Sequence, residues 1–275
     1  MIYHYTLECT FYEIECPLLP RGASLTLAHL SDVHSARYGS CADQAAAALR
    51  AHPPELICCT GDLIDCRHDA DGALFFSLLD RAPQVPVVAS LGNHEKRVEL
   101  HCGIQAFRAG CQARGITLLD NASAVLDTPA GPLRFYGYLQ RFIFYSDRNG
   151  ATRARLTQRV SANDLRQALG PCGDDGILLA HDPAPFAAYA EWGAPLTLSG
   201  HIHGGQIRLP PVGGVLSPAR RFFPRYSAGR YTLPRGGGRS PAQLIVSRGL
   251  VYPKAPRILN RPELSWIRLV GARGA

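Results

Sequence analysis

The sequence predicts an α/β fold in one domain. Three times in its first half, an apolar run of strand length leads into a polar cluster and then into a helix-prone stretch, which is the rhythm of α/β proteins. The composition, 46% hydrophobic and 19% charged residues, is globular and excludes disordered and fibrous classes. Length alone would also allow two domains. We expect a single domain over residues 1–275, long enough to fold without disulfide bonds.

The elements of the first half follow from runs of β-branched and apolar residues bounded by Pro, Gly or Asp. Strands are predicted at residues 5–15, 25–30, 56–60 and 85–91. Ala-rich or periodic apolar stretches predict helices after three of these strands. The helices are expected at 41–51, 71–81 and 95–114, with the last one weakened around Gly103.

The second half has shorter strands and more loops. Strands are predicted at 123–126, 133–138, 177–180, 196–198, 244–247 and 264–269. Helices are predicted at 161–169, where Ser161 is expected to cap the N-terminus and Asp164 to stand at the third helical position, and at 183–192. Residues 140–160 are polar and aperiodic and are predicted to form a loop or lid. Residues 210–240 are rich in Pro, Gly and Arg and are predicted to form a long ordered loop.

Five of the ten histidines lie where a predicted strand ends, each with Asp, Asn, Glu or another His nearby. They are His34, His94, His181, His201 and His203. In α/β sheets, ligands bind beyond the carboxyl ends of the strands, so these clusters are expected to meet. Mixed carboxylate and imidazole ligands favour a transition metal over calcium. Six or seven such ligands suit two ions about 3.5–4 Å apart, an arrangement that serves phosphoryl transfer.

Each cluster taken alone also has a purely structural interpretation. Asp32-x-His34 fits a capped turn, while Gly61-Asp62 and Gly92-Asn93-His94 fit ordinary turns. His181 alone is typical of a core or surface histidine whose polar atoms are satisfied. The run from Gly200 to His203 is more specific. The chemical interpretation depends on the conjunction of five clusters at strand-to-loop junctions, which no structural account explains together.

Together these residues resemble the signature of the calcineurin-like metallophosphoesterases. The resemblance is carried by Asp32-x-His34, Gly61-Asp62, Gly92-Asn93-His94-Glu95, His181 and Gly200-His201-x-His203. The stretches 199–210, 226–229 and 261–264 are similar to one bacterial branch of that superfamily, which includes small phosphodiesterases and UDP-diacylglucosamine pyrophosphohydrolases. The resemblance implies a four-layer α/β/β/α sandwich of two mixed sheets.

The resemblance also implies a role for each matching residue. Asp32, His34 and His203 would hold one metal ion, Asn93, His181 and His201 the second, and Asp62 would bridge both. His94 would stabilise the transition state or protonate the leaving oxygen. Glu95 stands where the family usually has Asp, and we expect it to orient His94.

The activity implied is hydrolysis of a small phosphodiester or pyrophosphate by a hydroxide that bridges two divalent ions. Manganese is the metal we expect first, with Fe, Zn, Ni and Co as alternatives. The competing hypothesis is a catalytically silent interaction scaffold with the same fold. The complete set of ligands, together with His94, favours the enzyme.

The chain carries a net charge of +7, and all but two of its 29 basic residues are arginines. Either GC-rich codon usage or selection for anionic ligands explains this bias. Residues 220–226 mix arginine with aromatic side chains and suit a nucleotide, a membrane surface carrying a lipid-linked substrate, or simple packing with solvated arginines. Neither nucleic acid nor an obligate protein partner is expected.

The sequence features that bear on localisation indicate the cytoplasm. The N-terminus shows no signal-peptide pattern, no apolar run reaches 18 residues, and the nine cysteines are an odd number. Peripheral contact with the inner face of the membrane is the alternative that the basic and aromatic residues at 220–226 suggest.

Overall fold

Two six-stranded mixed sheets form the centre of the protein. In the computed structural model, residues 5–34, 41–141, 159–172, 176–209, 211–217, 222–235, 239–251 and 257–272 are described. The first sheet has the order β1-β14-β2-β3-β4-β5. Its strands are β1 (Glu8–Glu15), β14 (Glu263–Val270), β2 (Ser24–Leu30), β3 (Leu56–Thr60), β4 (Val87–Ser90) and β5 (Thr117–Leu119). Strands β2 to β5 run parallel, and β14 pairs antiparallel with β2.

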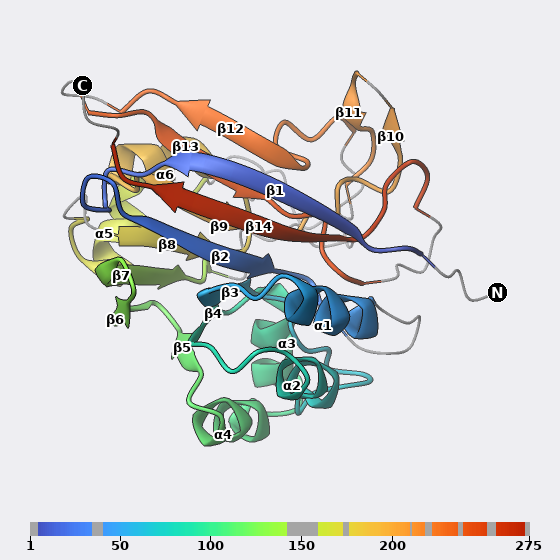
Figure 1. Ribbon diagram of the computed structural model, residues 1–275. Helices are drawn as coiled ribbons and strands as arrows, with labels where there is room; N and C mark the ends of the chain where they lie inside the picture. The colour runs from blue at the N-terminus through green and yellow to red at the C-terminus, as the bar shows by residue number, and fades with distance from the viewer. Residues whose placement is uncertain are drawn as a thin grey trace.

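The second sheet has the order β12-β13-β9-β8-β7-β6. Its strands are β12 (Gly229–Leu233), β13 (Ala242–Val246), β9 (Leu196–Ser199), β8 (Gly176–Ala180), β7 (Gly131–Tyr138) and β6 (Ala122–Thr128). Strands β7, β8, β9 and β13 are parallel, and an antiparallel strand closes each side. A small hairpin of β10 (Arg208–Leu209) and β11 (Gly213–Gly214) stands apart from both sheets (Figure 1).

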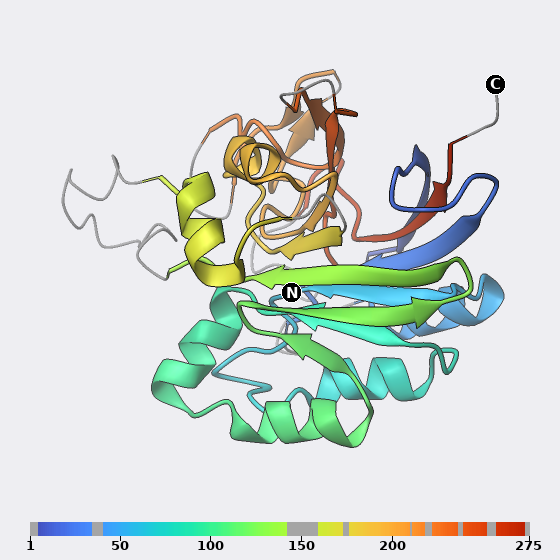
Figure 2. The ribbon, with the colours of Figure 1, turned by 90° about the vertical axis from the view of Figure 1, so that its left-hand side faces the viewer.

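Helices cover the outer faces of the two sheets. Four lie against the first sheet: α1 (Ala42–Ala51), α2 (Ala73–Asp80), α3 (Asn93–His101) and α4 (Gln105–Ala113). Two lie against the second sheet: α5 (Ala162–Leu169) and α6 (Phe186–Trp192). Figure 2 shows the two groups of helices on opposite sides of the stacked sheets. The four-layer α/β/β/α sandwich predicted from the sequence is therefore confirmed.

Three apolar clusters correspond to the three interfaces between these layers. The middle one joins the inner faces of the sheets, where Leu27 and Ile267 of the first sheet pack in one cluster with Phe135 and Leu179 of the second. Strands such as β3 and β8 are buried on both faces, which explains why they read in the sequence as continuous apolar runs rather than alternating ones. Within the described residues, no helix is long and apolar enough to cross a membrane.

The structure departs from the sequence prediction at four places, one of which is the hairpin of β10 and β11, where no strand was predicted. The helix predicted at 95–114 is two helices, because Gly103 adopts a φ of +80° that an α-helix cannot continue. Strand β5 was not predicted, since three residues are too few to show a pattern. Strand β12 lies in the segment predicted to be a loop; it is a half-exposed edge strand, so it lacks a continuous apolar run.

Some sequence predictions fall on residues outside the described ranges. Most of the segment predicted to be a loop or lid, at 142–158, is among them, as are residues 218–221 of the Arg-rich and aromatic stretch.

Candidate metal centre

The parallel strands of the two sheets bring all the predicted site residues to one edge of the sandwich. Asp32 and His34 follow β2, Asp62 follows β3, and Asn93, His94 and Glu95 follow β4 as the first turn of α3. From the second sheet, His181 follows β8, and His201 and His203 follow β9. Residues more than 150 positions apart in the sequence thus come into contact. For example, the backbone N–H of His201 donates to Asp32 Oδ2 at 3.1 Å.

The backbone at this edge is strained. Among the described residues, eight that are not glycine have a positive φ, and five of these are Asp32, His34, Asp62, His201 and His203, with φ between +47° and +69°. This left-handed region costs energy for any residue with a side chain, and such strain concentrates where function demands a particular orientation. Sharp turns directly after the strands therefore aim these side chains at a common point.

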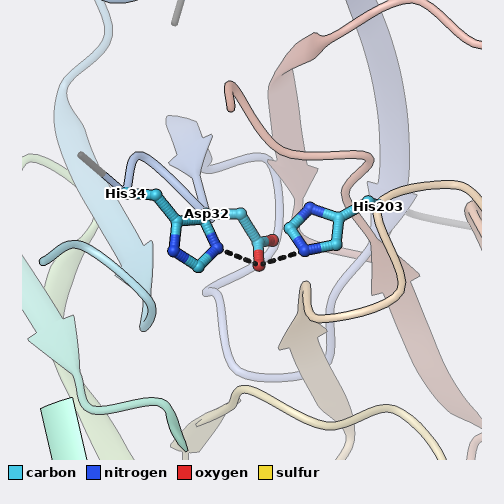
Figure 3. A group of neighbouring side chains, drawn as sticks. All are labelled: Asp32, His34 and His203. Atoms are coloured by element: carbon cyan, nitrogen blue, oxygen red, sulfur yellow. Dashed lines mark ion pairs between the residues drawn. The ribbon is translucent and has the colours of Figure 1, made fainter. Parts of the chain in front are cut away.

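One group of side chains surrounds Asp32, which is fully buried. The Nε2 atoms of His34 and His203 lie 3.8 Å and 3.7 Å from the same Asp32 oxygen, Oδ1. Figure 3 shows the two imidazoles on either side of that oxygen. The potential ligand atoms of all three residues lie within 4.8 Å of one another, so a single cation can contact all of them.

A second group surrounds Asp62, whose exposed fraction is 2%. His181 Nε2 lies 3.1 Å from Asp62 Oδ2, and His201 Nδ1 lies 3.2 Å from His181 Nε2. The two groups adjoin, because His34 Nε2 is 3.6 Å from Asp62 Oδ2 and His181 Nε2 is 3.8 Å from Asp32 Oδ1. The two groups therefore form one continuous cluster of potential metal ligands around Asp32 and Asp62.

In each carboxylate, one oxygen makes the shorter hydrogen bonds to the protein and the other faces the imidazoles of the centre. Asp32 Oδ2 accepts from the Ser31 hydroxyl at 2.8 Å, while its Oδ1 faces the three imidazoles. Asp62 Oδ1 accepts from the His94 backbone N–H at 2.8 Å, while its Oδ2 faces His181 and His34. Hydrogen bonds of this kind fix the orientation of metal ligands.

The pKa of His181 shows how strongly the carboxylates of the centre stabilise a positive charge. Burial would lower the pKa of His181, but the Asp62 and Asp32 carboxylates outweigh burial and raise it to about 10. Neighbouring imidazoles lower the pKa of both carboxyls despite their burial, with His203 the largest contributor at Asp32 and His181 the largest at Asp62. Two buried carboxylates need compensating positive charge. A protonated imidazole supplies it here, and a bound divalent cation would supply it equally.

The orientation of His181 suits a metal ligand. Its Nδ1 atom lies 2.7 Å from the Thr60 carbonyl oxygen. A carbonyl only accepts, so Nδ1 carries the proton and Nε2 presents its lone pair toward Asp62 once the imidazole is neutral. Carbonyl partners that fix the tautomer in this way are typical of histidines that ligate metals.

Polar atoms without a protein partner also fit a cation. Asn93 is 8% exposed, and its buried Oδ1 makes no hydrogen bond within the described part of the chain. A buried amide oxygen that accepts no hydrogen bond destabilises the fold. Coordination of a divalent ion would satisfy this oxygen. The oxygen and nitrogen donors present here therefore fit a divalent metal ion.

His94 lies at the exposed side of the centre and is paired with a residue that the sequence analysis missed. Its Nδ1 atom is 3.0 Å from Asp65 Oδ2, and its Nε2 atom is 4.0 Å from Asp62 Oδ2. The ring packs edge-on against His34, with centroids 4.3 Å apart. The signal that would have found Asp65 is its position three residues after Asp62, at the same strand end.

Glu95 was expected to orient His94, but its carboxylate lies elsewhere. It is fully buried and accepts four backbone N–H groups: those of Asp62 and Gly92 on Oε2, at 2.9 Å and 2.6 Å, and those of Leu63 and Ile64 on Oε1, at 2.6 Å and 3.1 Å. At the third position of α3, its side chain folds back on the helix N-terminus, as in a capping box. Asp65, and not Glu95, is the carboxylate at the His94 ring.

A further layer holds the loop that carries His201 and His203. The Asn260 side-chain amide donates to the His203 carbonyl at 2.8 Å and also to the Gly205 carbonyl. The buried Arg257 guanidinium donates to the Arg248 and Val251 carbonyls at 2.8 Å and 2.9 Å. These residues from the C-terminal part of the chain complete a rigid support behind His203.

Comparison with known proteins is consistent with this geometry. The family model for calcineurin-like phosphoesterases matches residues 25–205, a range that includes every predicted site residue. The chain is 26% identical over 267 residues to YkuE, an uncharacterized metallophosphoesterase of Bacillus subtilis, covering 95% of this chain and 85% of YkuE. It is 26% identical over 251 residues to the phosphodiesterase YaeI of Escherichia coli, covering 90% of this chain and 83% of YaeI.

Among solved structures, the phosphopantetheinyl hydrolase PptH of Mycobacterium tuberculosis is similar, with 16% identity and a TM-score of 0.44 over 66% of this chain and 84% of that one. The family model spans well over half of the chain and includes both halves of the site. The chain therefore belongs to the calcineurin-like phosphoesterase family and is a metal-dependent phosphoesterase.

Proposed function

We propose that the chain is a dinuclear phosphodiesterase or pyrophosphohydrolase. The observation that carries the proposal is a pair of buried carboxylates, Asp32 and Asp62, each with one oxygen held by the protein and the other turned toward shared imidazoles. Asp32, His34 and His203 would hold one ion, Asn93, His181 and His201 the other, and Asp62 would contact both. Manganese is the ion we expect first.

The chemistry supplied by two divalent ions is Lewis acidity, which neutralises phosphate oxygens and activates water near neutral pH. The chain's own contribution is to place the ligands without rearrangement, since strained turns and hydrogen bonds already fix them. Preorganised charges of this kind stabilise a transition state more effectively than mobile ones do.

His94 is proposed as the group that donates a proton to the leaving oxygen. Its ring is 20% exposed, compared with 10% for His34, 16% for His203 and 0% for His181. Asp65 holds Nδ1, which leaves Nε2 to face a substrate bound at the carboxylates. Proton transfer by a positioned side chain typically contributes about 10²–10⁴-fold to a rate.

Hydrolysis of bis(p-nitrophenyl) phosphate by protein loaded with Mn²⁺ tests the proposal. We expect turnover in the wild type and its loss in Asp62→Asn, because that change removes the shared carboxylate. A matched control is Asp69→Asn, which alters a buried carboxylate that caps α2 through the Ala73 and Leu74 N–H groups, at 2.7 Å and 3.1 Å, outside the centre. Equal turnover in wild type and Asp62→Asn would contradict the proposal. Absence of turnover, with metal bound, would favour a silent scaffold.

A lipid-linked substrate at a membrane surface is the second part of the proposal. Exposed apolar side chains gather on the hairpin and the two segments paired with it: Leu209, Val212, Phe222, Phe223, Ile258 and Leu259, each at least 45% exposed. Ile258 bridges to Ile207 next to β10, and Phe222 bridges to Leu216 after β11. We call these six residues the hairpin surface; the hairpin itself, β10 and β11, follows His201 and His203 closely in the chain.

Charge favours an anionic lipid bilayer as the partner of the hairpin surface. The chain is basic overall, and Arg225 lies within the same segment, with its guanidinium 5.2 Å from the Tyr226 ring centroid. Apolar side chains that enter the headgroup region, together with nearby cations, bind anionic membranes. Such contact would bring a lipid-anchored phosphate to the metal centre.

Flotation with vesicles of phosphatidylglycerol and phosphatidylcholine tests the membrane proposal. We expect wild type to float and Phe222→Ser/Phe223→Ser to remain in the soluble fraction. Phe11→Ser is the matched control, because Phe11 is 61% exposed on β1, far from the hairpin surface in sequence. Equal flotation of wild type and the double variant would contradict membrane contact through this surface.

A further inference from the structure

Two cysteine thiols lie in contact beside the metal centre. The Sγ atoms of Cys66 and Cys102 are 2.7 Å apart, although the residues are separated by 36 positions in the sequence. The Cys102 thiol also lies 3.5 Å from the Cys66 carbonyl oxygen. A disulfide bond is about 2.05 Å long, so the two sulfurs need only a small approach to become bonded.

The two cysteines connect the elements that carry His94 and its carboxylate partner. Cys66 directly follows Asp65, which pairs with His94 Nδ1 at 3.0 Å. Cys102 is the C-cap residue of α3, and the first turn of that helix contains Asn93 and His94. A bond between them would tie the segment after β3 to the helix after β4.

The exposure of this pair distinguishes it from most other thiols of the chain. Cys102 is exposed and Cys66 is partly exposed. Five cysteines are buried within the core and out of reach of oxidants: Cys16, Cys41, Cys58, Cys59 and Cys111. Access to solvent and a neighbouring resolving thiol are the features of redox-sensitive cysteines.

We propose that Cys66 and Cys102 are a reversible disulfide site that adjusts the Asp65–His94 pair. The oxidant we invoke is a peroxide. One sulfur attacks the O–O bond and forms a sulfenic acid as water leaves; the second sulfur then displaces the hydroxyl group as water and closes the S–S bond. Two thiols thus lose two electrons and two protons, and one hydrogen peroxide becomes two waters. A dithiol reductant reverses the step.

Either thiol can react first, because the two sulfurs lie in contact and either can donate the hydrogen bond between them. The other thiol is then correctly placed to resolve the sulfenic acid.

Closing the bond moves Cys66 toward α3 and draws the adjacent Asp65 with it. Displacements below 1 Å at a positioning residue are enough to change turnover several-fold or more. We expect kcat to fall at least threefold with little change in KM, because no metal ligand predicted here belongs to the moved segment after Asp62. This effect on turnover rests on the proposed phosphodiesterase activity, whereas the bond itself does not.

The experiment treats Mn²⁺-loaded protein with hydrogen peroxide and analyses tryptic peptides without reduction. The expected product links peptide 51–67, which contains Cys66, to peptide 98–108, in which Cys102 is the single cysteine. Cys66→Ser removes this product while Cys58 and Cys59 stay in the same peptide, so it controls for scrambling. Cys102→Ser at the exposed partner provides a second variant should Cys66→Ser fail to fold.

Three readouts decide the proposal together. We expect the linked peptide, a Tm about 5 °C or more higher after oxidation because the bond closes a long loop, and a loss of kcat that dithiothreitol restores. Absence of the linked peptide overturns the proposal, as does unchanged kcat in fully linked protein. A peroxide-induced loss of kcat in both serine variants equal to that in the wild type overturns it too. Linked protein that lacks activity even after reduction would instead contradict the proposed phosphodiesterase function.

Discussion

Replacement of Glu95 by glutamine distinguishes a role in holding the backbone from a role in orienting His94. In the structure, the two Glu95 oxygens accept four backbone N–H groups from two chain segments. A glutamine keeps one oxygen and turns an NH₂ group toward the other pair of donors. Two buried N–H groups then have no acceptor, and Asp62, in its left-handed conformation, loses one of the contacts that hold it.

The magnitude follows from the number of orphaned donors. Each buried donor without a partner costs about 1–3 kcal/mol, so two cost roughly 4 kcal/mol. Relief of the buried charge offsets part of this cost, since burial and the Asp62 carboxylate both raise the pKa of Glu95. For a protein of this size, about 2–4 °C of Tm corresponds to 1 kcal/mol. We expect Glu95→Gln to lower the Tm of the metal-free protein by about 10 °C.

Thermal unfolding followed by circular dichroism measures this shift. The matched control is Asp164→Asn at the equivalent third position of α5, where the carboxylate accepts from the exposed Ser161 N–H at 2.8 Å. Because that cap is solvated, its loss costs about 1 kcal/mol. A Glu95→Gln protein with wild-type Tm and selectively reduced kcat would refute the backbone role and return Glu95 to the orientation of His94.

Three further predictions concern the centre itself. His94→Ala should still bind metal, as measured by calorimetry, but should lose turnover by about 10²-fold or more. Asp65→Asn should also lower kcat. Full activity of His94→Ala at saturating Mn²⁺ would exclude the role of His94 as proton donor. In metal-free protein, His181 with its pKa raised to about 10 from 6.5 stabilises the fold fully below pH 6.5. That stabilisation should be lost as pH rises toward 10, visible as a falling Tm that His181→Asn flattens. Gly200→Ala should weaken Mn²⁺ binding, because a Cβ there overlaps Ser31 Oγ and Asp32 Oδ2; unchanged affinity in calorimetry would contradict this close packing.

The residue pattern was sufficient to predict the α/β class and the strand ends because buried parallel strands have a strong local signature, whereas the four-layer sandwich was implied by the family resemblance. The runs at β3 and β8 are buried at every position, so each reads as an uninterrupted apolar segment followed by polar residues. The position of each site residue at a strand end followed from the same boundaries. By contrast, β12 and β5 lie at edges of sheets and depend on their neighbours more than on their own residues.

What the sequence could not supply was the partner of each side chain. Glu95 and Asp65 are both carboxylates near His94, and only the turn after β3 decides that Asp65 contacts the ring while Glu95 folds back on the helix N-terminus. Likewise, Cys66 and Cys102 have no motif that relates them, because their contact depends on how α3 ends beside that turn. Asn260 supports His203 from a segment 57 residues away.

The central feature of the proposed centre is a pair of cations that share Asp62. Crystals grown with Mn²⁺ and measured for anomalous scattering provide the decisive test. We predict two peaks about 3.5–4 Å apart on either side of Asp62, one near Asp32, His34 and His203 and the other near Asn93, His181 and His201. A single peak, or peaks that do not contact Asp62, would contradict the dinuclear centre.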